Sequence, residues 1–135
     1  MTPGLDLKQE EVQATGQQFI TALSARDFNR LQAVFNPGVR SRLLIPAGLV
    51  TPFDAKGLIT KYQQWFGEAV FFDVQKVDIN CIGRRLGISY QILIQDADGW
   101  SVVEQHTCSS LEDGRIDRFD LVCSGFEPVP AREAG

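Results

Sequence analysis

"WSVVEQHTCSSLEDGRIDRFDLVC", from Trp100 to Cys123, is the stretch that decides the fold of this chain of 135 residues. Its two halves alternate around Asp113-Gly114, a pair that suits a type I′ turn because both central residues of that turn need positive φ. The stretch therefore predicts two antiparallel strands joined by a tight turn. It also holds His106, the single histidine of the chain, and two of the three cysteines.

Two further alternating segments precede this hairpin. They are "VFFDVQKVDINCI" (residues 70–82) and "RLGISYQILIQ" (residues 85–95), and short turns containing glycine separate all four segments. A period of two is typical of strands, and short turns join consecutive strands antiparallel. Residues 70–123 are therefore predicted to form one antiparallel meander.

The first half of the chain has a helical period instead. Apolar residues recur at three- and four-residue spacing in three segments: residues 9–25, residues 28–35 after Asp27, and residues 55–66 after Asp54. This spacing predicts three helices, and aspartate is a favoured N-cap for the second and third. A short strand is expected over residues 39–45. Helices followed by a meander indicate an α+β fold, with the helices packed on one face of a curved antiparallel sheet.

Composition narrows the possible partners. The net charge is −4 and the basic residues are scattered, which disfavours nucleic acid and anionic membranes because both attract basic surfaces. The cysteines form no C-x-x-C pair and no phosphate-binding loop is present, so we expect neither a metal nor a cofactor. The chain shows no apolar signal segment and no run near the ~18 residues of a membrane span, so we expect a cytoplasmic protein with reduced thiols.

Two short segments resemble a known superfamily. "ARDFNRLQAVF" (residues 25–35) and "EDGRIDRFDL" (residues 112–121), together with the order of elements, are similar to the NTF2-like superfamily, the SnoaL-like or ketosteroid-isomerase-like cone. The resemblance implies one domain over residues 1–135, with a core of about residues 9–126 and short flexible tails. It also implies a homodimer through the sheet. Members use the pocket of the cone for cofactor-independent chemistry, or only to bind.

The residues that define ketosteroid isomerases in this superfamily are replaced here. The position of the family's tyrosine falls on Phe19 and that of its aspartate falls near Leu43, and neither side chain can act as an acid or a base. In SnoaL-type cyclases an acidic base lies on the strand before the hairpin turn, and that position falls on His106, to within about one residue.

Closing the hairpin without irregularity predicts where His106 points. This pairing sets His106 opposite Leu121 and Glu104 opposite Cys123, so that both polar side chains face an apolar wall. A histidine beside a carboxylate in such a wall is suited to proton transfer. We therefore expect His106 as the general base and Glu104 as the group that orients it. The alternative, a structural histidine satisfied by hydrogen bonds, stays open.

The expected pocket has six further residues: Tyr90, Trp65, Arg42, Phe19, Cys123 and Phe119. The favoured function is that of a cofactor-independent lyase, isomerase or cyclase, acting on a small and largely apolar substrate that carries a carbonyl or a hydroxyl. The alternative is a non-catalytic module of the same fold that binds a small ligand or forms a dimer. An enclosed cavity beside the His106 ring would favour the enzyme, whereas a ring packed without a cavity would favour the non-catalytic module.

Overall fold

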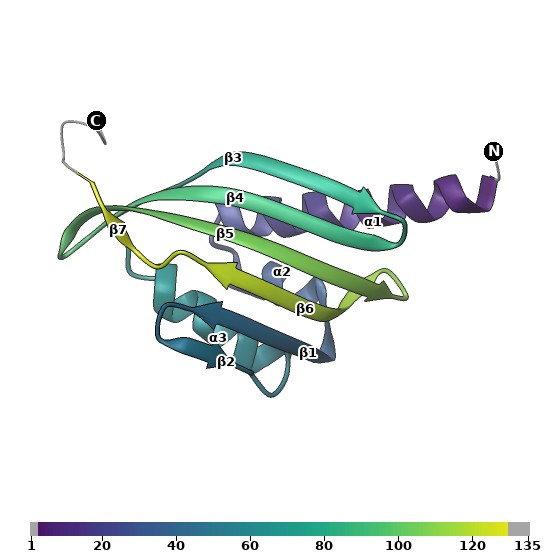
Figure 1. Ribbon diagram of the computed structural model, residues 1–135, viewed down its shortest axis with the longest axis horizontal. Coiled ribbons are helices and arrows are strands. Elements are labelled where there is room, and N and C mark those ends of the chain that lie inside the picture. Colours follow the sequence, from purple (N-terminus) through teal and green to yellow (C-terminus); the bar gives the residue numbers. More distant parts are fainter. Residues whose placement is uncertain (1–2, 130–135) are drawn as a thin grey trace.

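A computed structural model describes the backbone of residues 3–129 and the side chains of residues 9–129. The helices within this part are α1 (Pro3–Ser24), α2 (Phe28–Ala33) and α3 (Ala55–Phe66). The strands are β1 (Phe35–Ile45), β2 (Gly48–Val50), β3 (Phe71–Ile82), β4 (Arg85–Asp96), β5 (Gly99–Glu112), β6 (Arg115–Cys123) and β7 (Glu127–Pro128) (Figure 1). Residues 1–2 and 130–135, the ends of the expected flexible tails, lie outside the described residues, whereas α1 and β7 extend into the remaining parts of those tails, residues 3–8 and 127–129.

The strands form one curved sheet in the order β2-β1-β6-β5-β4-β3, with β7 paired to β5. The meander from β3 to β6 is antiparallel, as the alternating segments predict. One pairing departs from the expected antiparallel sheet, because β1 runs parallel to β6. A parallel pair needs a long connection, and the chain between β1 and β6 contains α3 and the other strands of the meander.

Two aspartates begin helices, as expected. The carboxylate of Asp27 accepts a hydrogen bond from the Arg30 amide at 3.1 Å, and that of Asp54 accepts one from the Gly57 amide at 2.8 Å. Each bond satisfies an amide that has no partner inside the helix. Next to Asp27, the Arg26 guanidinium donates to the carbonyls of Phe66 and Ala69, at 3.0 and 2.9 Å. Arg26 thereby ties the turn before α2 to the end of α3.

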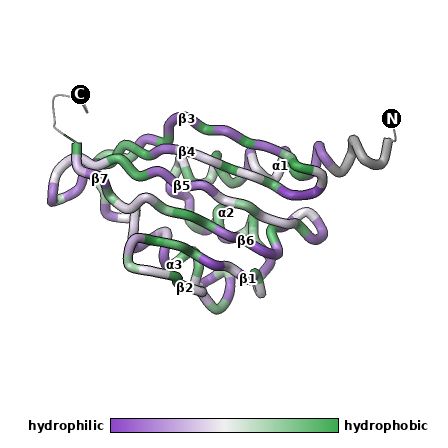
Figure 2. Tube along the Cα trace, viewed as in Figure 1, coloured by the Kyte–Doolittle hydropathy of each residue, from purple (hydrophilic) through white to green (hydrophobic). Residues whose placement is uncertain are grey.

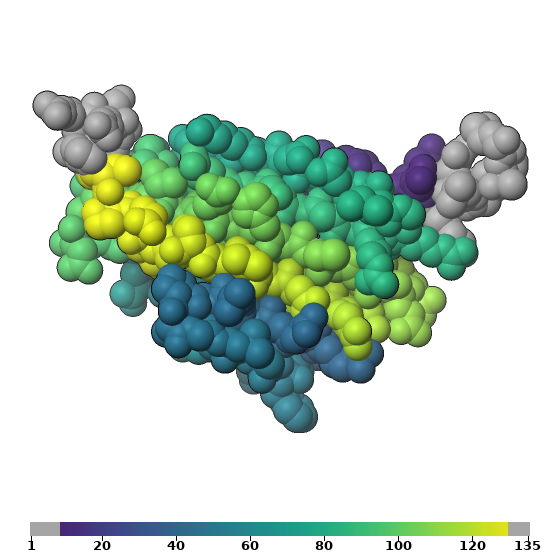
Figure 3. Space-filling model, in the orientation of Figure 1, coloured from purple at the N-terminus to yellow at the C-terminus, as the bar shows by residue number. Residues whose placement is uncertain are grey.

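The three helices lie on one face of the sheet, which we call the inner face (Figure 1). The rings of Phe19, Phe35 and Phe119 are buried there, with Phe35 and Phe119 meeting edge to face at 5.1 Å between ring centroids. Hydrophilic and hydrophobic residues alternate along the strands (Figure 2), which is the pattern of a sheet with one covered face. The opposite face, which we call the outer face, is the one seen in the space-filling view (Figure 3).

The hairpin of β5 and β6 contains a bulge that the regular pairing does not include. Glu112 pairs with Arg115 and Leu111 with Ile116, as expected, but Ser110 then pairs with Arg118, so Asp117 is an extra residue in β6. Strand β1, which lies beside β6, is irregular over the same region, between Phe35 and Arg40. The extra residue lets both Ile116 and Phe119 point inward, although they are three positions apart.

No helix among the described residues is both long enough and apolar enough to cross a membrane.

Candidate functional site

The bulge reverses the orientation expected for His106 and Glu104. Beyond it, Thr107 pairs with Leu121 and Gln105 with Cys123, so each residue of β5 sits one position away from the regular register. A shift of one residue moves every side chain to the other face. The side chains of His106 and Glu104 therefore lie on the outer face, with 58% and 52% of their surface exposed. The prediction that they face the interior is wrong.

The expected contact between these two residues does exist, and it continues to a third. His106 Nε2 lies 2.7 Å from Glu104 Oε1, and His106 Nδ1 lies 3.0 Å from the hydroxyl of Ser89. Ser89 is directly opposite His106 on β4, whereas Glu104 is two positions along β5 on the same face. Strand geometry thus places all three side chains on one face, where their hydrogen bonds form a row from Ser89 through His106 to Glu104.

Arg42 also lies on the outer face, in contrast to its expected place in the pocket. Its guanidinium donates two hydrogen bonds of 2.8 Å to the carboxylate of Asp120, the residue opposite it on β6. This contact holds the pKa of Asp120 below its usual value, the hydrogen bond being the largest cause. The prediction that Arg42 lies in the pocket is wrong because side chains of β1 alternate between the two faces, and Ser41 and Leu43 on either side of Arg42 take the inward positions.

A largely apolar groove of about 450 Å³ lies on this face. Its aliphatic wall includes three exposed residues: Leu44 on β1, Leu49 on β2 and Val122 on β6. The ion pair of Arg42 and Asp120 and the side chain of His106 also line it. The outer face therefore combines an apolar hollow with hydrogen-bonding groups.

Inside the sheet, four polar side chains form a second connected group. The hydroxyls of Tyr62 and Tyr90 lie 3.0 Å apart, and the Tyr90 hydroxyl donates to Gln105 Oε1 at 2.5 Å. The amide of Gln105 donates in turn to the sulfur of Cys123 at 3.4 Å. Tyr90, Gln105 and Cys123 are neighbours in one row across β4, β5 and β6, and Tyr62 meets them from α3. We call these four residues the interior cluster.

Burial determines the protonation state of the two tyrosines in the interior cluster. Loss of solvent around the phenols raises the pKa of Tyr62 and that of Tyr90 well above the usual value of 10.0. Both hydroxyls are therefore neutral hydrogen-bond donors at physiological pH. None of the buried side chains among residues 9–129 is a carboxylate or an imidazole. The described part of the interior thus offers hydrogen-bond donors but no base that works near neutral pH.

The other expected pocket residues do lie at the interior. Phe19 and Phe119 are fully buried with ring centroids 6.0 Å apart, and Phe19 also meets Tyr90 at 5.9 Å. Trp65 is half-buried on α3 and contacts Tyr62 edge to face at 5.3 Å. These rings fill the space between the helices and the sheet. A role in binding for Tyr90, Trp65, Phe19, Phe119 and Cys123 remains a prediction.

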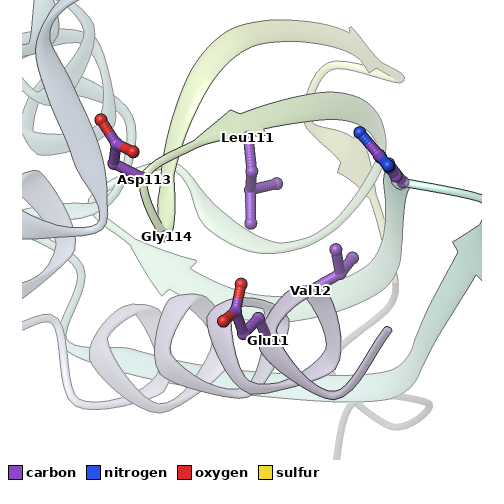
Figure 4. Close-up of a pocket in the computed structure, with 6 residues that line it drawn as sticks. Glu11, Val12, Leu111, Asp113 and Gly114 are labelled. Carbon is purple, nitrogen blue, oxygen red and sulfur yellow. The ribbon is translucent and has the colours of Figure 1, made fainter. Parts of the chain in front are cut away.

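A further hollow of about 450 Å³ lies where α1 meets the tip of the β5–β6 hairpin. Figure 4 shows Glu11 and Val12 on the helix and Leu111, Asp113 and Gly114 on the hairpin side. Thr15, which is buried nearby, has its hydroxyl 3.2 Å from the carbonyl of Gly114. This contact fastens the helix to the turn and gives the region a structural role.

Three residues of these groups were missed from the sequence: Tyr62, Gln105 and Ser89. Tyr62 belongs to the apolar stripe of α3, so its place in the core was readable but its hydroxyl contact was not. The regular hairpin pairing sets Gln105 on the face opposite His106, together with Thr107 and Ser109, and we expected that face to be wet, yet all three are buried. The bulge had a visible signal, since Ile116, Phe119 and Leu121 are spaced by three and then two positions.

Several solved structures of other proteins resemble this one, although no family model and no curated protein matches the chain. Among solved structures, Bal32a from a soil-derived mobile gene cassette has a TM-score of 0.74 at 11% identity, covering 87% of this chain and 92% of that one. An NTF-2 like protein of unknown function from Burkholderia xenovorans LB400 has a TM-score of 0.67 at 14% identity, with coverage of 92% and 89%. The chain adopts the NTF2-like fold.

The structural relatives differ in what they do. An LEH-like epoxide hydrolase of M. tuberculosis aligns with a TM-score of 0.66 at 16% identity, covering 85% of this chain and 84% of that one. One of these structures is thus that of an epoxide hydrolase, whereas the Burkholderia protein is of unknown function. At such identities the similarity establishes the fold, and the side chains of this chain must carry any argument about function.

Proposed function

We propose that this chain is a cofactor-independent dimerisation module of the NTF2-like fold, which pairs with a second copy of itself through the side of the outer face formed by β2, β1 and β6. The observation that carries the proposal is the apolar groove on that face. Leu44, Leu49 and Val122 expose 49%, 62% and 53% of their surface around it. Covering such side chains removes apolar surface from water, which favours association.

The charges of the outer face fit a second copy. The face carries both signs of charge, since Arg42 pairs with Asp120 and the side chains of Arg118 and Glu104 are also exposed. A two-fold axis can bring opposite charges of the two copies together.

Sedimentation analysis of Val122→Lys tests this assignment. We expect the unaltered chain to be a dimer at micromolar concentration, and we expect Val122→Lys to raise the dimer dissociation constant by about a hundredfold, because each copy would then bury an ammonium group in the interface. Phe53→Lys is the matched control, since Phe53 is 92% exposed but lies outside the groove. A monomeric unaltered chain, or equal effects of the two variants, would overturn the proposal.

The lyase, isomerase or cyclase chemistry expected of His106 inside the cone has no support in this geometry. The imidazole lies outside the cone, and the interior cluster holds neutral tyrosines. We therefore place the dimerisation alternative first.

The interior cluster favours a second candidate function, the binding of a small and largely apolar molecule with a carbonyl or hydroxyl oxygen. Tyr62 and Tyr90 present hydroxyls within an apolar interior, and a few convergent polar groups in apolar surroundings are typical of ligand sites. Because the rings fill the interior, entry requires a movement of the half-buried Trp65.

Cyclohexanone is a suitable probe for this second candidate, followed by NMR. We expect shifts at the amides of Tyr62, Tyr90 and Gln105, and a dissociation constant raised about fivefold or more in Tyr90→Phe, because one buried donor is lost. His106→Gln on the outer face is the control and should bind as the unaltered chain does. Shifts confined to the outer face would exclude the interior as the site.

A further inference from the structure

The row of Ser89, His106 and Glu104 has a defined direction of hydrogen bonding. An ionised carboxylate can only accept, so His106 Nε2 carries the hydrogen that points to Glu104 Oε1, at 2.7 Å. The neutral ring then has a lone pair on Nδ1, and the Ser89 hydroxyl donates to it at 3.0 Å. A hydroxyl, an imidazole base and an orienting carboxylate in series are the arrangement that activates a serine nucleophile.

A hollow of about 190 Å³ opens beside this row. Ser89, His106 and Glu104 line it, together with Lys76 and Gln91. It lies over β3, β4 and β5, whereas the apolar groove lies toward β6, β1 and β2, with His106 bordering both. A small substrate can therefore reach Ser89 from the side away from the groove.

Lys76 reaches the hollow because β3 is irregular there. The register shifts between Gln75 and Asp78, and Asp78 pairs with Ser89, so the bulged residues lie next to the serine. Lys76 itself has a φ of 52°, a conformation uncommon for a residue with a side chain. Bulges often redirect a side chain beside a functional site. The ammonium of Lys76 and the amide of Gln91 are hydrogen-bond donors carried by residues that line the same hollow, and a carbonyl oxygen that develops charge is stabilised by such donors.

We propose that Ser89 is a nucleophile for acyl transfer from small carboxylic esters, with His106 as the base and Glu104 as a positioning residue. The bond from Ser89 Oγ to the carbonyl carbon forms and the bond to the alkoxide breaks, while the serine proton passes to His106 Nδ1 and then to the alkoxide. Water next attacks the acyl carbon and gives a proton to His106, which returns it to Ser89. An acid and an alcohol are released, and no cofactor is consumed.

A fluorophosphonate ester tests the nucleophile directly. Ser89 Oγ bonds to phosphorus as the phosphorus–fluorine bond breaks, and mass spectrometry of the digested chain locates the adduct. We expect the adduct on Ser89 in the unaltered chain and no adduct there in His106→Gln, which keeps the shape of the side chain but cannot take a proton at neutral pH. Ser110→Ala, in a strand serine without a histidine contact, is the control and should label normally. Labelling elsewhere, or none, would refute the proposal.

Hydrolysis of p-nitrophenyl acetate measures turnover. A positioned base contributes roughly 10²–10⁴-fold, so Ser89→Ala and His106→Gln should each lower kcat/KM at least about a hundredfold. Glu104→Gln should lower kcat with little change in KM, because it alters the orientation and charge of the base and not the binding of the ester. Cys108→Ser removes the nearby exposed thiol and should leave the rate unchanged. A rate retained in Ser89→Ala would show that no acyl-serine forms.

Discussion

Gln105 and His106 are neighbours in β5, yet their surroundings are opposite. Gln105 is fully buried, and both ends of its amide are bonded inside the interior cluster. His106 bonds Glu104 and Ser89 in a setting where more than half of its side chain meets solvent. A hydrogen bond lost in the interior leaves a polar group without a partner, whereas water replaces a bond lost on the outer face. The inner face of the sheet should therefore control stability and the outer face association and chemistry.

The largest difference in stability between substitutions on the two faces is expected at β6, where Phe119 points inward and Val122 outward. Phe119→Ala removes a ring that packs against Phe35 and Phe19, and such changes cost about 3–5 kcal/mol. Val122→Ala should cost less than about 1 kcal/mol. Urea unfolding of both variants at one protein concentration measures the comparison. Similar losses of stability would mean that the two faces are not distinct.

A smaller difference is expected between Gln105→Leu and His106→Leu, and it tests the register itself. Gln105→Leu takes away the acceptor of the Tyr90 hydroxyl, and a lost partner in the interior costs about 1–3 kcal/mol. His106→Leu should change the free energy of unfolding by less than about 0.5 kcal/mol because its contacts are exposed. The regular hairpin pairing predicts the reverse order, so urea unfolding of these two variants separates the registers.

The fold was largely predictable from the sequence, because period and turn chemistry carry it. The alternation in residues 70–123 and the aspartate caps at Asp27 and Asp54 each indicate one local structure, and the structure has it. The direction of β1 was not predictable in the same way, since its partner β6 is distant in the chain.

The candidate site was predictable only in part, because it depends on the parity of each strand. The pairing of His106 with Glu104 follows from a spacing of two within a strand, and it is present. Their face depends on Asp117, a single extra residue next to the irregular part of β1. Hydropathy did not reveal the error, because the inward residues Gln105, Thr107 and Ser109 are polar. The face on which His106 and Glu104 lie is set by the register between strands, and a single sequence gives little information about that register.

A tyrosine titration compares the interior with free solution without any substitution. The chain has two tyrosines, both in the interior cluster, and burial raises the pKa of each above the usual 10.0. The folded state therefore disfavours the phenolate, and the resulting stabilisation is complete below about pH 10 and is lost as the pH rises above it. We expect no tyrosinate absorbance near pH 10 while the chain remains folded by circular dichroism, followed by a rise that coincides with unfolding. A reversible rise in the folded chain would show that the cluster is open to water.

The smallest effect is expected on the outer face, at Arg42 and Asp120. The hydrogen bond and the charge of Arg42 hold the pKa of Asp120 below its usual 3.8. A depressed pKa in the folded state means that the contribution to stability is present above about pH 4 and disappears as the pH falls through the lowered value. Arg42→Met should return the pKa of Asp120 toward its usual value, as followed by carboxyl NMR, whereas Arg40→Met, on the same face of β1, should change it less. Arg42 is exposed over 65% of its side chain in the single chain, so added salt should weaken the shift in the monomeric Val122→Lys variant. The unaltered dimer should respond less, because a second copy keeps water and salt away from the ion pair. Equal responses to salt would count against a second copy on this part of the outer face.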